Sequence, residues 1–552
     1  MLVWVGQHPV SFFASALIIL AAYIALAVWP RPSARLSEGA VDIVYCLTMT
    51  VVLFAWRWPV FISPNPLNAD EGQMVANALK ATIDLVPWRG FDGTTSGPLN
   101  SDVLALAALV GAHIDFFSAR VIGLLMIAGA LCALYFAIRW TFDARIARLS
   151  LVPPVVMFAF VRDLDFVHYS SEHLPIFLTT VALACAAYIA GSRGTAQRRV
   201  WAAAVAGLCI GCTGFAKLQA IPIALIVFLY AVAAIMLTRS TPGARSRNEA
   251  VAVFAGMALP FVIILGAVVA TGEWNDFVTS YLRFAAAYVD AKGRVGIGFF
   301  FGGIAQYATF LTSALVVAVA GVTILVARRV RIGPAARVAA LSSIALLAAA
   351  VFAIYEAHRG FPHYLLLSVV PIAWCTANLL GAVETAVPAG RSRVALHAAY
   401  VVLFVVPALR QLALTPDFFM KDLPVSAHWP QNPVSIAMER YVPRGASVAV
   451  WGWMPQYYVE TGTIMATRDA HTHHQIEPGP LQSYFRDRFM NDLASHPPPL
   501  IVDAVAPGSF GYTNNVAQGI DSFAALASFV RTRYVLAEDV GGVRIFRMRR
   551  SQ

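Results

Sequence analysis

The sequence contains few charged residues. Of its 552 residues only 13% are Asp, Glu, Lys or Arg, whereas 59% are hydrophobic. An ordinary soluble domain carries about 25% charged residues. The composition therefore excludes a typical soluble protein of this length and predicts a chain that crosses a membrane many times.

Signatures of common soluble enzymes are also missing. The chain has no P-loop, no G-x-G-x-x-G after a strand, no serine nucleophile elbow and no kinase signature. The six cysteines all lie in apolar stretches, so no disulfide framework supports the C-terminal tail. Cys209 and Cys212 match C-x-x-C, but they stand in a helix rich in small residues, which favours helix packing over redox chemistry.

Apolar runs long enough to cross a bilayer recur from the N-terminus to about residue 413. We expect about twelve membrane-spanning helices. The first lacks the basic n-region of a signal peptide and is expected to stay uncleaved. The expected spans are 10–29, 39–61, 118–139, 146–162, 174–191, 201–216, 218–238, 250–271, 301–327, 337–355, 363–383 and 394–413.

The net charge of +10 is a topology signal and does not indicate a nucleic-acid partner. The arginines gather in alternate short loops, which the positive-inside rule places in the cytoplasm. Both termini and the loops 62–100, 162–173, 272–300 and 356–362 are then expected outside. The cytoplasmic arginines are Arg31, Arg35, Arg139, Arg145, Arg148, Arg193, Arg198, Arg199, Arg239, Arg245, Arg247, Arg328, Arg329, Arg331, Arg337, Arg391 and Arg393.

The outward loop 62–100 begins with N68-A-D-E-G-Q-M, two adjacent acids next to a membrane span. The stretch QMVANALKATIDLVP is amphipathic and predicts a helix lying along the membrane surface, with Val75 and Ile83 on its apolar face. Asp70 is placed to cap this helix, with Gln73 three residues later as in a capping box. The following SDVLALAALVGA is too short to span the bilayer.

The tail predicts a compact extracytoplasmic α/β domain over residues 414–552, after a membrane bundle over 1–413. ASVAVWGW and LIVDAV have the composition of strands, and YVLAEDVGGVRIFRMR that of a hairpin around Gly541 and Gly542. LQSYFRDRFMNDLASH has helical spacing.

The acids Asp70 and Glu71 have two interpretations. Loops often carry such residues as caps and turn formers. A partly desolvated carboxylate can also act as general base, here deprotonating an acceptor hydroxyl that attacks an activated sugar. A phosphate leaving group on a lipid would then need cations near the outer leaflet. The candidates are Arg57, Lys80, Arg89, Arg120, Lys217, Arg359, His358 and His363. Lys217 can equally snorkel to the interface.

Five pieces in order, NADEGQMVANA, GTTSGPLNSDVL, Arg120, GFAKLQAIP and FPHYLLLSVVP, resemble the GT-C superfamily of membrane glycosyltransferases. The similarity covers about residues 40–400. It points to the bacterial branch that resembles protein mannosyltransferases, aminoarabinose transferase and rhizobial galacturonosyltransferases. An extra N-terminal span departs from most members, in which the acidic loop follows the first helix.

The resemblance implies an inverting transfer of a sugar from a polyprenyl-phosphate donor. It makes Asp70 the catalytic base, with Glu71 orienting the acceptor or assisting a cation. The same resemblance places Lys217, His363 and Tyr364 at the donor phosphate. Two further cations from the candidate set are predicted to join them there, namely Arg120 and Arg359.

A second polar cluster consists of Asp163, Asp165, His168, Glu172 and His173. It predicts a site for the acceptor or for a divalent cation, and a hydrated loop explains it nearly as well. The segment H471-T-H-H could bind zinc, but we expect an exposed loop there. The acidic residues permit a metal without requiring one.

We therefore expect a polytopic α-helical membrane protein with a C-terminal α/β domain, located in the bacterial cytoplasmic membrane with its active site on the outer face. Its expected partners are membrane lipids, a polyprenyl-phosphate sugar and a glycolipid, polysaccharide or protein acceptor. A transporter or flippase for a lipid-linked saccharide is the alternative, and a polysaccharide polymerase is another. Charge-poor spans disfavour transport. The residues name neither the sugar nor the oligomeric state.

Overall fold

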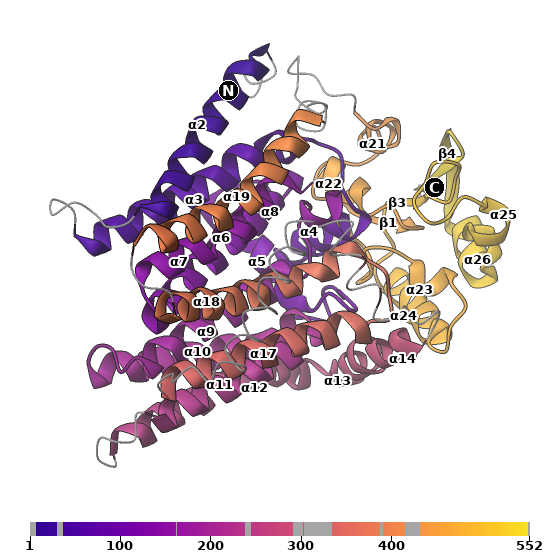
Figure 1. Cartoon of the computed structure of the whole chain (residues 1–552). Helices are drawn as coiled ribbons and strands as arrows, with labels where there is room; N and C mark the ends of the chain where they lie inside the picture. The colour runs from indigo at the N-terminus through magenta and orange to yellow at the C-terminus, as the bar shows by residue number, and fades with distance from the viewer. Residues whose placement is uncertain are drawn as a thin grey trace. The chain divides into compact units, whose positions relative to one another are not determined.

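The structure is a computed structural model of the whole chain (Figure 1). It describes residues 7–29, 37–161, 163–237, 244–290, 298, 302, 334–386, 390–414 and 431–549. The chain divides into two compact units. The first, here called the helical unit, comprises Met1–Ser63, Gly123–Ile264 and Lys292–Ala427. The second, here called the sheet unit, comprises Pro64–Ile122, Leu265–Ala291 and His428–Gln552.

The helical unit consists mainly of long apolar helices. Its elements are α2 (Pro9–Val28), α3 (Glu38–Phe61), most of α6 (Phe116–Thr141), α7 (Ala144–Ser150), α8 (Val152–Phe160), η2 (Leu164–Phe166), α9 (His173–Ala190), α10 (Ala196–Ala216), η3 (Leu218–Ala220), α11 (Ile221–Leu237), most of α12 (Ala244–Thr271), α17 (Pro334–Glu356), η6 (Pro362–Ser368), α18 (Val369–Ala386) and α19 (Arg391–Leu414).

Within the described ranges, ten helical segments are long and apolar enough to cross a membrane, and they coincide with ten of the expected spans. The expected span 146–162 is instead divided into α7 and α8, which meet at Leu151. Pro153 and Pro154 follow at once, and both fit the first turn of a new helix, where their missing N–H groups are not needed for intrahelical hydrogen bonds.

Some expectations lie outside the described residues. These are the span 301–327, part of the loop 272–300, the chain around the predicted domain boundary from 415 to 430, and the loop arginines Arg31, Arg35, Arg239, Arg328, Arg329 and Arg331.

Glycines allow a close approach of α10 and α12. A Cβ atom at Gly207 would lie 2.0 Å from the Val253 carbonyl oxygen, and one at Gly256 would lie 2.3 Å from that of Ala204. Any side chain at these positions would push the helices apart, because the obstructing atoms are backbone. This supports helix packing as the reason for the small residues around Cys209. Figure 1 also shows α9 beside α10 and α11, and α17 beside α11 and α18.

The sheet unit combines the loop after α3 with the C-terminal part of the chain. Its elements are α4 (Ala69–Ala81), α5 (Pro98–Ala105), η1 (Leu106–Val110), α13 (Trp274–Asp276), η5 (Phe277–Arg283), α14 (Phe284–Asp290), α21 (Pro433–Glu439), β1 (Ser447–Trp451), α22 (Gln456–Thr461), β2 (Ile464–Met465), α23 (His473–Ile476), α24 (Gln482–Ser495), β3 (Leu500–Asp503), α25 (Asn515–Gln518), η7 (Ile520–Ser522), α26 (Ala524–Arg533), β4 (Tyr534–Val540) and β5 (Val543–Met548).

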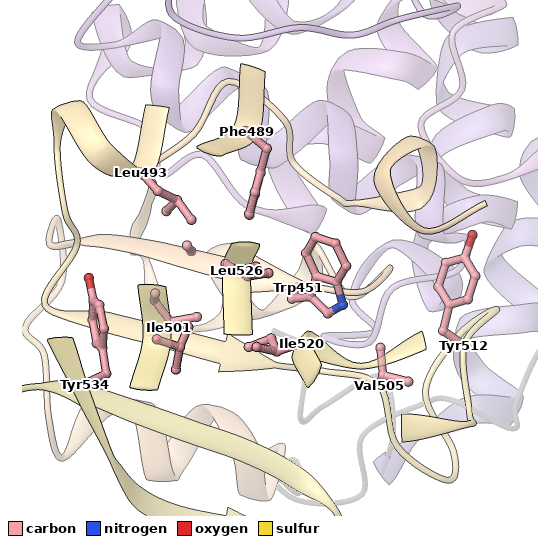
Figure 2. Packing of buried hydrophobic residues seen from close by; sticks show 11 residues of the cluster. Trp451, Phe489, Leu493, Ile501, Val505, Tyr512, Ile520, Leu526 and Tyr534 are labelled. Carbon is pink, nitrogen blue, oxygen red and sulfur yellow. The ribbon is translucent and has the colours of Figure 1, made fainter. Parts of the chain in front are cut away.

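The described strands form one mixed sheet in the order β2-β1-β3-β5-β4. β1 is parallel to β2 and β3, while β5 is antiparallel to β3 and β4. Gly541 and Gly542 both have positive φ, as the predicted tight turn between β4 and β5 requires. Apolar side chains from β1, β3, α24 and α26 pack against one face of the sheet, with Trp451, Phe489 and Leu526 among them (Figure 2).

Helix α4 differs from the expected surface helix. It ends at Ala81, so Ile83 lies beyond it and is 67% exposed, whereas residues on all sides of the helix from Glu71 to Ala78 are buried. It packs against α5, α22 and β2. The amphipathic interpretation was wrong because alanine, glycine and amide side chains let α4 be enclosed by neighbouring elements.

Candidate active site

The two acids that open α4 have different surroundings. The N-cap is Asn68 and not Asp70 as expected: the Asn68 side chain accepts a hydrogen bond from the Asp70 backbone N–H at 2.9 Å. Asp70 therefore has its side chain in the first turn without being needed as a cap. It is half-buried, and within the described part of its unit no hydrogen bond or ion pair engages its carboxylate.

Glu71 is fully engaged. Both of its oxygens face Arg120, with Nε–Oε1 at 2.9 Å and Nη2–Oε2 at 2.7 Å, and both side chains are completely buried. The Leu67 N–H donates to Glu71 Oε2 at 3.2 Å, and Arg120 Nη2 donates to the Asn65 carbonyl at 2.6 Å. The pair thus ties the chain before α4 to the start of α6. Arg120 was predicted at the donor phosphate, and the structure places it beside Glu71.

A buried polar chain supports α4 from its other side. Gln73 Nε2 donates to the Gly93 carbonyl at 3.2 Å, and Gln73 Oε1 lies 3.2 Å from His471 Nε2. Burial lowers the pKa of His471 to about 3, and the neighbouring His473 adds to this effect. His471 is therefore neutral at ordinary pH and can donate to Gln73.

This arrangement corrects the expectation of an exposed H471-T-H-H loop. The segment is largely enclosed within the sheet unit, because His471 and Thr472 are buried and His473 contacts Tyr512. Over the residues that the structure describes, no group of three His, Cys, Asp or Glu side chains is placed to hold a metal ion.

Two arginines of the C-terminal part hold the loop D92-G-T-T-S-G. The sequence did not predict this role for them. Arg488 Nη1 donates to Asp92 Oδ2 at 2.7 Å, and Arg488 Nη2 donates to Asp469. The Asp92 N–H donates to the Arg468 carbonyl at 2.8 Å. No sequence signal pairs residues almost 400 positions apart, so only the fold reveals this support.

In the helical unit, Lys217 lies between α10 and η3 and is buried. Its ammonium group pairs with Glu172, donates to Ser171 Oγ at 2.7 Å and stands 4.8 Å from the centre of the Tyr364 ring. Burial alone would raise the pKa of Glu172, but the charges of Lys217 and His363, with hydrogen bonds from Lys217 and Ser170, lower it to about 2.

The remaining predicted residues of this unit extend the same cluster. His363 Nδ1 lies 3.3 Å from Asp165 Oδ2, and the His168 ring meets the His363 ring edge-on at 5.8 Å. Asp163 caps η2 by accepting the Asp165 N–H at 2.9 Å. Burial raises the pKa of Asp163. The structure therefore brings together two groups that the sequence suggested separately. We call this set the Lys217 cluster. Its members are Asp163, Asp165, His168, Glu172, Lys217, His363 and Tyr364.

Arg359, predicted at the donor phosphate, lies half-buried in the turn between α17 and η6. It follows His358, which has a positive φ of 48°. Its assignment to the phosphate stays a prediction.

Comparison with known proteins found no matching family model and no matching curated protein. Solved structures do match. ArnT from Cupriavidus metallidurans bound to undecaprenyl phosphate is 13% identical, with a TM-score of 0.53, and the match covers 91% of this chain and 97% of that one. The apo state of the same protein is 15% identical, with a TM-score of 0.50 and coverage of 92% and 98%. These matches confirm that the chain shares the fold of ArnT, as the resemblance to GT-C glycosyltransferases predicted.

Proposed function

Proceeding from the GT-C fold, we propose that this protein is a membrane glycosyltransferase that moves a sugar from a polyprenyl-phosphate donor to an acceptor hydroxyl. The observation that carries the proposal is the contrast between two adjacent acids. Glu71 is locked in a buried pair with Arg120, while the Asp70 carboxylate next to it stays uncommitted. The helix dipole favours an acid in the first turn, but it does not require one whose carboxylate has no other partner among the described residues, beside a locked neighbour.

In the proposed step the acceptor hydroxyl gives its proton to the Asp70 carboxylate and its oxygen attacks the anomeric carbon. The bond from that carbon to the phosphate oxygen breaks, and the polyprenyl phosphate leaves with the bonding electrons. A single displacement of this kind inverts the anomeric centre. Asp70 acts as general base. Glu71 is a positioning residue, because its contacts hold the start of α4.

The leaving phosphate requires a cation, and we assign this role to Lys217 with His363 and Tyr364. An ammonium group has three N–H donors. Glu172 and Ser171 each accept one of them, which leaves one N–H without an acceptor among the described residues. The ion pair with Glu172 holds the Lys217 ammonium group in place, so the remaining donor can serve a phosphate oxygen. Undecaprenyl phosphate bound to ArnT supports a carrier of this class.

We infer that the acceptor is a glycolipid, a polysaccharide or a protein at the outer face of the bacterial cytoplasmic membrane. The orientation follows from the arginine-rich loops, which the positive-inside rule assigns to the cytoplasm. No described feature favours a transporter or a polymerase over a single-sugar transferase.

The test is thermal unfolding of the purified protein with increasing undecaprenyl phosphate, in the wild type, Asp70→Asn and Lys217→Ala. At about 100 times its dissociation constant the lipid should add roughly 2.7 kcal/mol to the stability of the wild type and of Asp70→Asn. Lys217→Ala should require a higher concentration of undecaprenyl phosphate to reach the same stabilisation. If no concentration stabilises the wild type, the polyprenyl-phosphate carrier is wrong.

A further inference from the structure

The helical unit contains a second polar site, a cavity lined by five arginines. Its volume is about 530 Å³, within the range of pockets that hold small organic ligands. The arginines come from four parts of the chain: Arg139 in α6, Arg145 and Arg148 in α7, Arg193 after α9, and Arg393 in α19. Cations from so many elements converge on one hollow only when the fold, and not the local sequence, brings them together.

This cavity and the Lys217 cluster lie at opposite ends of the same helices. Glu172 directly precedes α9, whereas Arg193 follows its end, and 18 helical residues span about 27 Å. In the same way His363 precedes α18, while Glu384, which also lines the cavity, is near its end. The cavity is therefore separate from the Lys217 cluster, and its function does not depend on the proposed transfer.

Four carboxylates also line the cavity, and three of them pair with arginines. The pairs are Arg139 with Asp42 at 2.8 Å and with Glu38 at 3.2 Å, Arg393 with Glu384, and Arg145 with Glu384 at 3.8 Å. The fourth carboxylate, that of Asp143, accepts the backbone N–H groups of Arg145 and Ile146 as the N-cap of α7.

Arg148 and Arg193 have no carboxylate partner among the described residues. Arg148 is only 3% exposed; its Nη2 donates to the Trp29 carbonyl at 3.0 Å and its Nε has no hydrogen-bond partner in the described structure. Arg193 is exposed and donates to the Trp140 carbonyl at 3.3 Å. A buried guanidinium without a counter-charge is costly. The cavity thus has a positive excess that an anion would neutralise.

We propose that the cavity binds a phosphate group, supplied by the head group of an anionic membrane lipid. Guanidinium groups match phosphate oxygens with paired N–H donors, and basic pockets between the ends of membrane helices suit lipid head groups. Apolar side chains beside the cavity point outward: Ile43, next to Asp42, is 59% exposed, and Val394, next to Arg393, is 56% exposed. These side chains offer a surface on which the acyl chains of a lipid can pack. A free anion has no acyl chains and would gain nothing from this surface.

The binding test uses the purified full-length protein in a neutral detergent, with thermal unfolding followed as phosphatidylglycerol, phosphatidylcholine or glycerol phosphate is added. Phosphatidylglycerol should stabilise the protein saturably, and phosphatidylcholine, whose head group carries no net charge, should not. If glycerol phosphate alone has the full effect, the phosphate site stands and the lipid source is wrong. If none of the three stabilises the protein, the proposal is overturned.

Variants locate the binding. Arg148→Gln should weaken phosphatidylglycerol binding roughly tenfold or more, the loss expected for a charge-assisted hydrogen bond. Arg193→Ala changes an exposed residue, so it keeps the proposal testable if the buried substitution prevents folding. Arg198→Ala is the matched control. Arg198 is exposed in the first turn of α10, close in sequence to Arg193, but it does not line the cavity. Equal losses in Arg193→Ala and Arg198→Ala would mean diffuse surface attraction and would overturn the site.

Discussion

Arg120 holds both carboxylate oxygens of Glu71 from 49 positions along the chain, and neither side chain has any exposed surface. Glu71 therefore already has a charged partner within the protein, and its carboxylate does not need a substrate or a cation to neutralise it. Its neighbour Asp70 has no such partner in the described part of the unit. Two adjacent acids that look alike in sequence thus have different surroundings: one is locked in a buried ion pair, and the carboxylate of the other is unengaged among the described residues of the unit.

Glu71→Gln should destabilise the protein much more than Asp70→Asn. Removing the Glu71 charge leaves a buried Arg120 uncompensated, at a cost of about 3–5 kcal/mol, whereas Asp70 loses no internal partner and the change should cost less than about 1 kcal/mol. The apparent unfolding temperatures of both variants in one detergent make the comparison. Equal destabilisation would contradict the division of roles.

Asp70→Asn should reduce sugar transfer by at least about a hundredfold, the scale of general-base catalysis, while undecaprenyl phosphate still stabilises the variant. Asparagine keeps the size of the side chain but cannot take the proton. Transfer is measured by mass of the glycosylated acceptor in membranes, with Asp84→Asn as a control in the same unit. Normal turnover by Asp70→Asn would remove Asp70 as the base.

Glu172 and Lys217 should show strong energetic coupling. Glu172→Gln leaves Lys217 buried and unpaired, and Lys217→Met does the same to Glu172, each costing about 3–5 kcal/mol. The double substitution removes both charges and should cost less than the two single costs combined. A thermal double-mutant cycle tests this, and simple additivity would show that the pair is not coupled.

The ion pair of Glu172 and Lys217 also predicts that the stability of the protein depends on pH. The folded pKa of Glu172, about 2, lies below its ordinary value near 4.5. Its stabilising contribution is therefore complete above pH 4.5 and is lost as the pH falls toward 2. Unfolding temperatures of the wild type should fall over this window more than those of Glu172→Gln. Parallel curves would contradict the low pKa.

Asp102 should make the stability of the protein depend on pH in the opposite direction. Burial raises the pKa of this α5 carboxyl to about 7, and among the described residues its Oδ1 has no hydrogen-bond partner. The unfolded chain releases this proton near pH 3.8, so stability falls as the pH rises from about 4 to 7. Asp102→Asn should raise stability at pH 8 by a few kcal/mol and change it little at pH 4. The check is the unfolding temperature at both values; a variant that is no more stable at pH 8 would contradict it.

Arg488→Lys should loosen the loop D92-G-T-T-S-G. Lysine carries the same charge but cannot donate to Asp92 and Asp469 through one planar group, and an unsatisfied buried acceptor costs about 1–3 kcal/mol or more. Limited proteolysis and the unfolding temperature measure the effect, with Arg531→Lys on the exposed side of α26 as control. Matching behaviour of the two variants would show that the fork geometry is unimportant.

The sequence predicted the elements that depend on local patterns. Ten of the spans, the β4–β5 turn at Gly541 and Gly542, and helix α24 could all be found in this way, because apolar length, paired glycines and helical spacing are properties of short segments. The division of 146–162 into α7 and α8 had a local signal in Pro153 and Pro154. The burial of α4 had none.

By itself, then, the sequence determined the membrane-spanning helices and the placement of an acidic pair beside one of them. Only the tertiary structure decided which acid is free, that Lys217 meets Glu172 and that five arginines share a cavity. These facts depend on contacts between segments tens to hundreds of residues apart. Hydropathy and spacing act along the chain, whereas the partner of a buried charge is fixed by packing in three dimensions.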